Sequence, residues 1–487
     1  MKICLIKPPQ ITPLEWGRQA PLQPLGLAYL AAVLEKDHEV SILDAQAEAW
    51  DQVKKIGDKY YFGLPPEEIE KKIKDLNPEL VGISVQFSID EESSLAVAKL
   101  VKSINKKIIT VLGGPHCSVR PLDVLSNPDV DFVVLREGEE TFFELARELA
   151  GGNYGSLEKV LGIAYKKDGQ PFFTPPRPFI QNLDLLPLPA RHLLPMEKYF
   201  QAAESGQVPR DIYTFSPRWA SVITSRSCPY NCAFCSVHLS MGRGFRPRSP
   251  ENVVEEIEQL VRDYRIEHIN FEDDNMTLDK KRFKDICDLM VARNIKITWS
   301  TPNGIRADAI DEELVQKMKK SGCKRVVVSP ESGVQRVVSQ IIKKNLDLKK
   351  IEEAVALFKK HGIEVDASFV VGMIGETKKD IWATIRYGLK LKRLGMSKAG
   401  FNIATPLYGT ELYELAKQKN YLKKDMSSSL LSPSSCLIDT PEWTGQEVRA
   451  FCALGNWLVN YNLREKILKG FSGFHKYFKH IGKLLNL

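Results

Sequence analysis

Residues 220–235 decide the fold of this chain, and they read Ala220-Ser-Val-Ile-Thr-Ser-Arg-Ser-Cys228-Pro-Tyr-Asn-Cys232-Ala-Phe-Cys235. The β-branched run Ala220–Thr224 predicts a strand, and a C-x3-C-x2-C sequence follows it directly. The chain has nine cysteines among 487 residues, too few for a disulfide scaffold, and three of them stand at this one spacing. The stretch therefore predicts a loop that presents three thiolates at the end of a strand.

Three thiolates limit the kind of metal site that this loop can build. They do not complete a closed Cys4 zinc site, and no fourth Cys or His stands at a zinc-finger distance, His238 being the nearest. Three do suit a [4Fe–4S] cluster in which one iron is left open for a ligand. Zinc and a pure electron-transfer cluster stay as alternatives, although an electron carrier normally uses four cysteines.

Strand and helix patterns alternate from this loop onward. Six βα units predict a partial (β/α)6 TIM-like barrel over residues 216–415, with polar clusters just after the strands, at the face that holds active sites in such barrels. Amphipathic patterns predict helices at about 250–264, 279–293, 311–321, 347–361 and 378–394. The predicted strands are Ala220–Thr224, His268–Phe271, Lys296–Ser300, Arg325–Val328, Val365–Val371 and Gly400–Ala404.

The cysteine loop and the barrel pattern together resemble the radical SAM superfamily. The resemblance implies that Cys228, Cys232 and Cys235 hold a [4Fe–4S] cluster whose open iron binds S-adenosylmethionine (SAM). In the loop Gly372–Thr377, isoleucine stands where relatives usually have proline. The resemblance places Phe234 against the adenine and Arg306 as a clamp for the SAM carboxylate. The residues that it places around SAM are Phe234, Asp273, Asp274, Asn275, Asn303, Arg306, Glu331, Ser332 and Gly372.

Residues 1–155 predict a different α/β unit, a doubly wound parallel sheet of Rossmann-like type. The predicted strands are Lys2–Ile6, Val40–Leu43, Leu80–Val85, Ile108–Leu112 and Phe132–Leu135. This unit resembles the cobalamin-binding domain of B12-dependent radical SAM enzymes. The resemblance implies cofactor contacts at Leu25, Gly26, Asp44, Gly113, Gly114, His116, Glu137 and Gly138. The chain lacks an Asp-x-His-x-x-Gly sequence, so the lower ligand of cobalt is left open, and a domain without cobalamin is the alternative.

The remaining segments predict a connector and a helical C-terminal region. Residues 156–215 are rich in proline and hold a predicted hairpin around Lys167-Asp168-Gly169, whereas residues 416–487 predict mainly helix.

The net charge of the chain is +7, of which +5 comes from residues 461–487, so the rest of the chain offers no broad positively charged surface for nucleic acid. The tail predicts a basic amphipathic helix, which either lies on an anionic membrane surface or packs on the barrel. No apolar run approaches the roughly 18 residues that span a bilayer, and the predicted location is the cytoplasm.

The resemblance implies a B12-dependent radical SAM enzyme, most simply a methyltransferase. A 5′-deoxyadenosyl radical would activate an unreactive carbon of a small or lipid-like substrate, methylcobalamin would donate the methyl group, and a flavodoxin or ferredoxin would supply single electrons. Catalytic residues beyond the cofactor ligands are not predicted. Alternatives are a cyclase, oxidase or lipid-modifying enzyme without net methyl transfer, and a non-catalytic iron–sulfur and corrinoid carrier or sensor. A tRNA methylthiotransferase would need an additional set of cluster cysteines, which Cys4 and Cys117 do not make.

Overall fold

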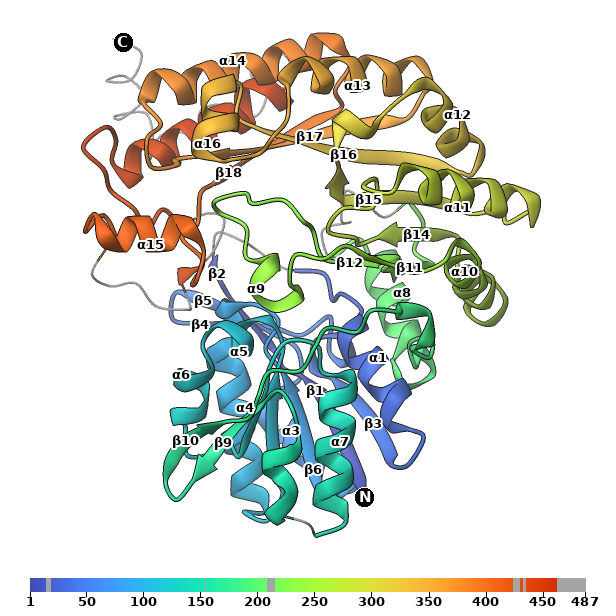
Figure 1. Cartoon of the computed structure of the whole chain (residues 1–487), viewed down its shortest axis with the longest axis vertical. Coiled ribbons are helices and arrows are strands. Elements are labelled where there is room, and N and C mark those ends of the chain that lie inside the picture. The colour runs from blue at the N-terminus through green and yellow to red at the C-terminus, as the bar shows by residue number, and fades with distance from the viewer. Residues whose placement is uncertain (15–18, 153, 208–214, 424–429, 432–434, 462–487) are drawn as a thin grey trace. The chain divides into compact units, whose positions relative to one another are not determined.

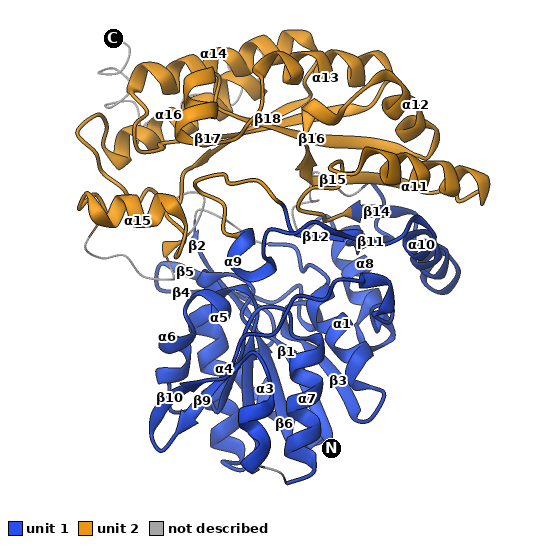
Figure 2. Cartoon of the chain, in the orientation of Figure 1, with its two compact units in different colours: residues 1–228, 237–270 blue, residues 229–236, 271–487 orange. Residues whose placement is uncertain are grey.

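A computed structural model describes residues 1–14, 19–152, 154–207, 215–423, 430–431 and 435–461 (Figure 1). The chain forms two compact units (Figure 2). Unit 1 comprises Met1–Cys228 and Val237–Asn270, and unit 2 comprises Pro229–Ser236 and Phe271–Leu487. The first elements of the predicted barrel thus cluster with the N-terminal sheet. The divisions predicted near residues 155, 215 and 415 stay predictions.

The main sheet of unit 1 has seven strands in the order β10-β9-β8-β7-β6-β1-β3. The first five strands of the chain in this sheet are parallel, and a hairpin from the predicted connector adds two antiparallel strands at one edge. The predicted doubly wound sheet is therefore confirmed, and it extends beyond residue 155. Its strands are β1 (Lys2–Lys7), β3 (Glu39–Asp44), β6 (Leu80–Ser84), β7 (Ile109–Gly113), β8 (Phe132–Val134), β9 (Ile163–Lys167) and β10 (Gln170–Phe173).

Both faces of this sheet are buried, because side chains alternate along each strand. In β1, Cys4 and Ile6 join one core while Ile3 and Leu5 join the other. Helices α3, α4, α5 and α6 cover the first face, and α1 and α7 cover the second. These helices are α1 (Leu25–Leu34), α3 (Pro66–Leu76), α4 (Glu91–Ile104), α5 (Pro115–Val119), α6 (Pro121–Ser126) and α7 (Glu139–Ala150).

The parallel strands are ordered so that the chain reverses direction across the sheet between β1 and β6. This is the flavodoxin-like arrangement, in which ligands bind beyond the carboxyl ends of the strands at the reversal point. A three-stranded antiparallel sheet, β2-β5-β4, was not expected from the sequence. Its strands β2 (Gln10–Pro13), β4 (Val53–Ile56) and β5 (Lys59–Phe62) have four residues each, and β4 is exposed along its whole length, so their sequence patterns are weak.

Unit 1 also contains two further helices, α2 and α8, and the elements that flank the cysteine loop. They are α2 (Ala45–Glu48), α8 (Met196–Glu204), β11 (Trp219–Val222), β12 (Ser225–Arg226), α9 (Val237–Met241), β13 (Arg246–Pro247), α10 (Pro250–Tyr264) and β14 (His268–Phe271), whose last residue begins unit 2. The short strands β12 and β13 pair antiparallel, with Arg226 opposite Arg246. The cysteine loop therefore begins at one strand of this two-stranded sheet and ends at the other.

The predicted barrel strands form one sheet in the order β11-β14-β15-β16-β17-β18. Neighbouring strands from β15 to β18 are parallel, which confirms the predicted βα repeat. The elements of unit 2 are β15 (Thr298–Ile305), β16 (Cys323–Glu331), β17 (Glu364–Val371), β18 (Lys398–Ile403), α11 (Lys280–Ala292), α12 (Glu312–Lys320), a π-helical turn (Val337–Ile341), α13 (Leu348–Lys360), α14 (Lys378–Leu394), α15 (Glu411–Gln418) and α16 (Gly445–Asn460).

Helix α16 covers the edge strand β18, which would otherwise present unpaired backbone groups. Asn456 exchanges hydrogen bonds of 2.9 and 3.0 Å with the backbone of Phe401. One turn further, Asn460 exchanges bonds of 2.8 and 2.7 Å with the backbone of Ala399. Two amides spaced four residues apart thus imitate a neighbouring strand.

In the C-terminal region the structure forms helix α16, in line with the predicted helix, whereas Leu422 and Ile438 form an isolated β-bridge. The basic tail over residues 462–487 lies outside the described residues. Across the described part of the chain, we find no helix with the length and apolar character that a membrane span requires.

Candidate active site

The three cysteines of the loop differ from most other cysteines of the chain in their exposure. Cys228, Cys232 and Cys235 are half-buried, whereas five of the remaining six are buried. Burial raises the pKa of Cys4 to about 11 and the pKa of Cys287 to about 12. Because a metal is bound by the thiolate, a cysteine with such a pKa is a poor ligand at neutral pH. The half-buried cysteines of the loop are therefore better placed for ligation than the buried ones.

The loop itself is held by backbone hydrogen bonds at its centre. The amide of Ala233 donates to the carbonyl of Ile342, and its own carbonyl accepts from the amide of Leu412, both at 2.9 Å. Phe234 follows, half-buried, directly before Cys235. The aromatic side chain that the sequence predicts against adenine is thus fixed to a backbone that is anchored on both sides.

A [4Fe–4S] cluster requires a different arrangement of cysteine sulfurs from a single metal ion. Within the described ranges, no group of three or more His, Cys, Asp or Glu side chains is arranged so as to hold one metal ion. The three thiolates of a [4Fe–4S] cluster bind three different irons, so they are not required to converge on one point. The loop with its three reachable sulfurs fits such a cluster.

The predicted SAM contacts after β14 differ in their exposure to solvent, and a predicted contact on β15 is bonded to the same segment. Asp273 and Asn275 are each 2% exposed, whereas Asp274 is exposed. Asn303 uses its side-chain amide to bind the carbonyl of Glu272 at 2.8 Å, which ties the end of β15 to the end of β14. Asn303 therefore positions the segment that carries the three polar residues.

Arg306, the predicted clamp for the SAM carboxylate, is already engaged within unit 2. Its guanidinium binds both carboxylate oxygens of Asp308, at 3.0 and 2.7 Å, and the carbonyl of Asn345 at 2.6 Å. It also lies 3.7 Å from the centre of the Tyr230 ring. Because Tyr230 stands between Cys228 and Cys232, this cation–π contact ties β15 to the cysteine loop.

Glu331 and Ser332, the predicted contacts after β16, are buried and paired. Glu331 binds the ammonium of Lys344 at 2.7 Å, and Lys344 also donates to the carbonyl of Ser329 at 2.6 Å. The hydroxyl of Ser332 lies 3.0 Å from that of Thr384 on α14. Sequence reasoning missed Lys344, because nothing local distinguishes it from Lys343, which precedes it on the surface.

The loop after β17 is stabilised by a carboxylate that folds back on it. Glu376 accepts hydrogen bonds from the amides of Gly372 and Met373, both at 2.8 Å, through one oxygen. The other oxygen is buried without a hydrogen-bond partner. Burial raises the pKa of Glu376 to about 8. Gly372 has a positive φ of 86°, and a Cβ there would lie 2.8 Å from Val448, so only glycine fits.

Asp44, a predicted cobalamin contact in unit 1, is fully buried beneath the carboxyl end of β3. Its carboxylate accepts from the amides of Gln46 and Ala47 at 3.0 Å and so caps α2. The hydroxyl of Tyr199 donates to it at 2.6 Å, and the Lys7 ammonium lies 3.4 Å away. Both oxygens of the Asp44 carboxylate therefore already have hydrogen-bond partners within the protein.

The turn after β7 lies at the carboxyl end of that strand, and its two glycines, Gly113 and Gly114, present backbone atoms there. Gly114 has a φ of 117°, and a Cβ there would lie 2.7 Å from the carbonyl oxygen of Val85. Gly113 lies partly exposed next to it. The ring of His116 is almost fully buried, with Nδ1 2.9 Å from the hydroxyl of Ser88 and Nε2 3.5 Å from Glu91. Gly114 is therefore required by the packing of this turn against Val85. The carboxyl end of β7, where the turn lies, is the edge at which such sheets bind their ligands.

The other predicted cobalamin contacts belong to the starts of α1 and α7. Leu25 is buried, and Gly26 is exposed with no atom within 4 Å of its missing Cβ. Gly138 is partly exposed and precedes α7, whereas the carboxylate of Glu137 is buried. Glu137 binds Arg226 on β12 and Arg246 on β13, a pairing that the sequence did not predict.

Comparisons with known proteins agree with both halves of this description. Residues 18–146 match the model of the B12 binding domain, and residues 222–388 match that of the radical SAM superfamily. An uncharacterized methyltransferase of Pyrococcus horikoshii is 37% identical over 423 residues, which cover 87% of this chain and 84% of that protein. The cytidylyl-2-hydroxyethylphosphonate methyltransferase of Streptomyces wedmorensis is 32% identical over 465 residues, which cover 89% and 85%.

A solved structure shares the fold. It is that of the radical SAM methyltransferase TsrM of Kitasatospora setae with tryptophan and a SAM analogue bound. It matches with a TM-score of 0.68 and 18% identity, covering 86% of this chain and 76% of that one.

Fold, cysteine loop and family models together define a radical SAM enzyme preceded by a B12-binding domain. The chain belongs to the family of cobalamin-dependent radical SAM enzymes. The predicted family, fold class and cofactor set are thereby confirmed, and the cofactors are a [4Fe–4S] cluster, SAM and cobalamin. An enzyme of this class takes a small-molecule substrate and an external reductant.

Proposed function

We propose that the chain is a methyltransferase that methylates an unactivated carbon of a small or lipid-like molecule in the cytoplasm. When bound, the cluster and SAM supply a 5′-deoxyadenosyl radical, and cobalamin supplies the methyl group. The observation that carries the proposal is the loop with three half-buried cysteines, in a chain whose first unit matches a B12-binding domain. The methyltransferases named above support methyl transfer as the outcome.

The chain's own residues would hold, orient and shield these groups. Cys228, Cys232 and Cys235 would bind the cluster, and Phe234 would pack beside the adenine. The loop at Gly372 and the segment at Asp273 would border SAM. In unit 1, the backbone at Gly113 and Gly114 would border cobalamin. Which atom takes the lower face of cobalt stays open in this proposal.

The proposal is tested without knowledge of the natural substrate. Anaerobically reconstituted protein with hydroxocobalamin, a chemical reductant and SAM labelled in its methyl group should release 5′-deoxyadenosine. It should also carry the label on its bound cobalamin. Release of 5′-deoxyadenosine with no label on cobalamin would retain a radical SAM enzyme and contradict methyl transfer, as expected of a cyclase or oxidase. A protein that binds zinc in place of iron would contradict the whole proposal.

A cysteine variant with a matched control tests the ligand set. Cys232→Ala should lose most of the bound iron and all release of 5′-deoxyadenosine, because a missing thiolate leaves an iron without its protein ligand. Cys287→Ala, in the buried face of α11, should keep both. Equal iron content in the two variants would contradict the assignment.

The partners and surroundings of the proposed enzyme rest on the sequence. A flavodoxin or ferredoxin would serve as the one-electron donor. The basic tail over residues 462–487 would lie on an anionic membrane near a lipid-like substrate. Deletion of residues 463–487 should then lower sedimentation with liposomes that contain anionic lipid, and unchanged sedimentation would remove this part of the proposal.

A further inference from the structure

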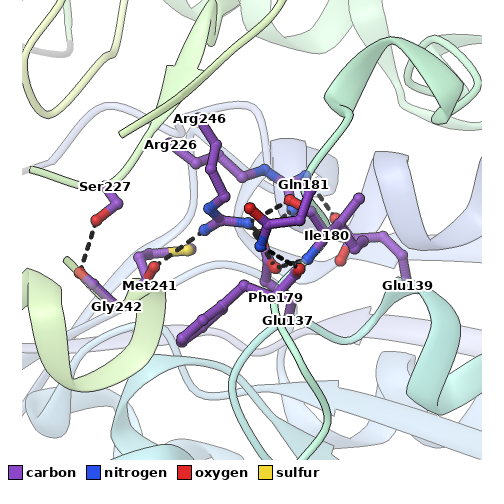
Figure 3. Close-up of polar contacts among 10 residues, drawn as sticks. All are labelled: Glu137, Glu139, Phe179, Ile180, Gln181, Arg226, Ser227, Met241, Gly242 and Arg246. Carbon is purple, nitrogen blue, oxygen red and sulfur yellow. Dashed lines mark hydrogen bonds and ion pairs between the residues drawn. The ribbon is translucent and has the colours of Figure 1, made fainter. Parts of the chain in front are cut away.

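Both ends of the cysteine-bearing loop meet at a buried group of charges in unit 1 (Figure 3). The loop leaves β12 after Arg226 and returns to β13 at Arg246, and these two residues are paired across the short ladder. Two like charges side by side would repel each other, and both side chains are at least nine-tenths buried. The ends of the loop therefore need an acidic partner between them.

Glu137, from the turn after β8, is that partner. Its carboxylate binds Arg226 at 2.7 Å and Arg246 at 2.6 and 2.7 Å. It also accepts from the amide of Ile180 at 2.9 Å, so both of its oxygens are occupied. Glu139 binds Arg226 at 2.6 Å. Figure 3 shows the carboxylate of Glu137 directed at the two guanidinium groups. Two arginines and two glutamates leave this group without net charge.

The same group reaches into the loop itself. Arg246 donates to the carbonyl of Met241 at 3.0 Å, and the hydroxyl of Ser227 donates to the carbonyl of Gly242 at 2.6 Å. Gly242 lies against the ring of Phe179 so closely that a Cβ there would be 2.6 Å from it. Since Ser227 directly precedes Cys228, these contacts fix the point at which the first thiolate enters the loop.

We propose that Glu137 is a positioning residue for the cluster: by bridging Arg226 and Arg246 it fixes the two ends of the loop over residues 227–242, and with them Cys228. This inference rests on the proposed function, because it presumes that the loop holds a [4Fe–4S] cluster. Glu137 is not itself a predicted ligand of the cluster, and it acts through the two arginines. It also lies at the carboxyl end of β8, beside Gly138, so the ligand edge of the N-terminal sheet is joined directly to the cluster loop.

Unit 1 supplies a matched control for a merely structural effect. Glu256 on α10 is 1% exposed and also lies between two buried arginines, Arg191 at 2.6 Å and Arg248. Arg248 keeps further bonds to the carbonyl of Ile223 and to Asn252. Loss of Glu256 therefore removes the same kind of buried ion pair without releasing an end of the cysteine loop.

The experiment compares reconstituted wild-type protein with the variants Glu137→Gln and Glu256→Gln. We expect both variants to lower the urea midpoint of unfolding. Only Glu137→Gln should change the electron paramagnetic resonance spectrum of the reduced cluster and its response to SAM. It should also lose iron to a chelator about tenfold faster than Glu256→Gln, the factor expected for one lost charge-assisted hydrogen bond. The same spectrum and the same rate of iron loss in both variants would overturn the inference.

Two other outcomes are distinguished from a failure of the inference: loss of cluster uptake by the wild-type protein, and failure of Glu137→Gln to fold. Failure of the wild-type protein to take up a cluster would refute the proposed function and not the role of Glu137 alone. Should Glu137→Gln fail to fold, Glu139→Gln replaces it, because that change weakens the hold on Arg226 while Glu137 stays in place. Glu139→Gln is expected to lose iron several-fold faster than Glu256→Gln, and loss at or below the Glu256→Gln rate would overturn the inference.

Discussion

Replacing Glu376 with glutamine should make the protein less sensitive to alkaline pH. Glu376 is fully buried, and burial raises its pKa from 4.5 to about 8, against the effect of the two amides that it accepts from. The protonated carboxyl is thus favoured in the folded state. Glutamine has the shape of that form, and its carbonyl oxygen can accept from the same amides of Gly372 and Met373.

The sign and size of the effect follow from linkage. Between the unfolded pKa and the folded pKa, the folded state binds a proton that the unfolded state has lost, so stability is highest below pH 4.5 and falls as pH rises to about 8. The full difference corresponds to about 5 kcal/mol at about 1.4 kcal/mol per pKa unit. Between about pH 5.5 and about pH 8.5, wild-type protein should lose about 3 kcal/mol relative to Glu376→Gln.

The assay is urea unfolding of the apoprotein over this pH range, with the variant subtracted from the wild type so that other titrating groups cancel. Glu447→Gln is the control, because the pKa of Glu447 is lowered by hydrogen bonds from Lys378 and Thr444, against the effect of burial. That control should lack the alkaline loss. A wild-type minus Glu376→Gln difference that stays flat from acid to alkaline pH would refute a buried, protonated Glu376.

Two further substitutions test the packing of the turn at Gly114 and the buried pair of Lys344 and Glu331. Gly114→Ala should cost about 1–3 kcal/mol and lower the retention of cobalamin, because its φ of 117° and a carbonyl oxygen 2.7 Å from the new Cβ both oppose a side chain. Gly244→Ala, with no atom within 4 Å, should change neither quantity, and an equal effect on both would contradict the argument. Lys344→Met should cost about 3–5 kcal/mol in urea unfolding, because it leaves the buried Glu331 carboxylate unpaired. Lys343→Met, in a half-exposed pair, should cost less than about 1 kcal/mol, and similar losses for the two lysines would show that Glu331 does not need its partner.

Local patterns were sufficient for the main elements of the fold. The run His268–Phe271 was predicted as a strand with the bounds that the structure gives, and the helix predicted at about 378–394 is α14. β-Branched runs and the spacing of apolar residues depend on neighbours along the chain, and such signals survive folding. Short exposed strands such as β4 carry little of this signal, which explains why the three-stranded sheet was missed.

The partners of charged residues near the site could not be predicted in the same way. Arg306 was predicted as a clamp for the SAM carboxylate, but its fork binds Asp308 and its face lies on Tyr230. Asp44 caps a helix and accepts from Tyr199, 155 residues away. The sequence shows that a charge is present, but its partner depends on how distant segments pack, so the role of such a residue could not be read in advance.

Short stretches of sequence were enough to predict the three cysteine ligands and the order of strands and helices, because C-x3-C-x2-C and the apolar periods are complete within such stretches. The contacts at the two ends of the cysteine loop, in contrast, depend on the tertiary structure. Glu137 and Arg246 are 109 residues apart, and no local pattern joins them. Their pairing exists because the packed interior excludes water, and a buried charge is stable only where folding brings an opposite charge to meet it.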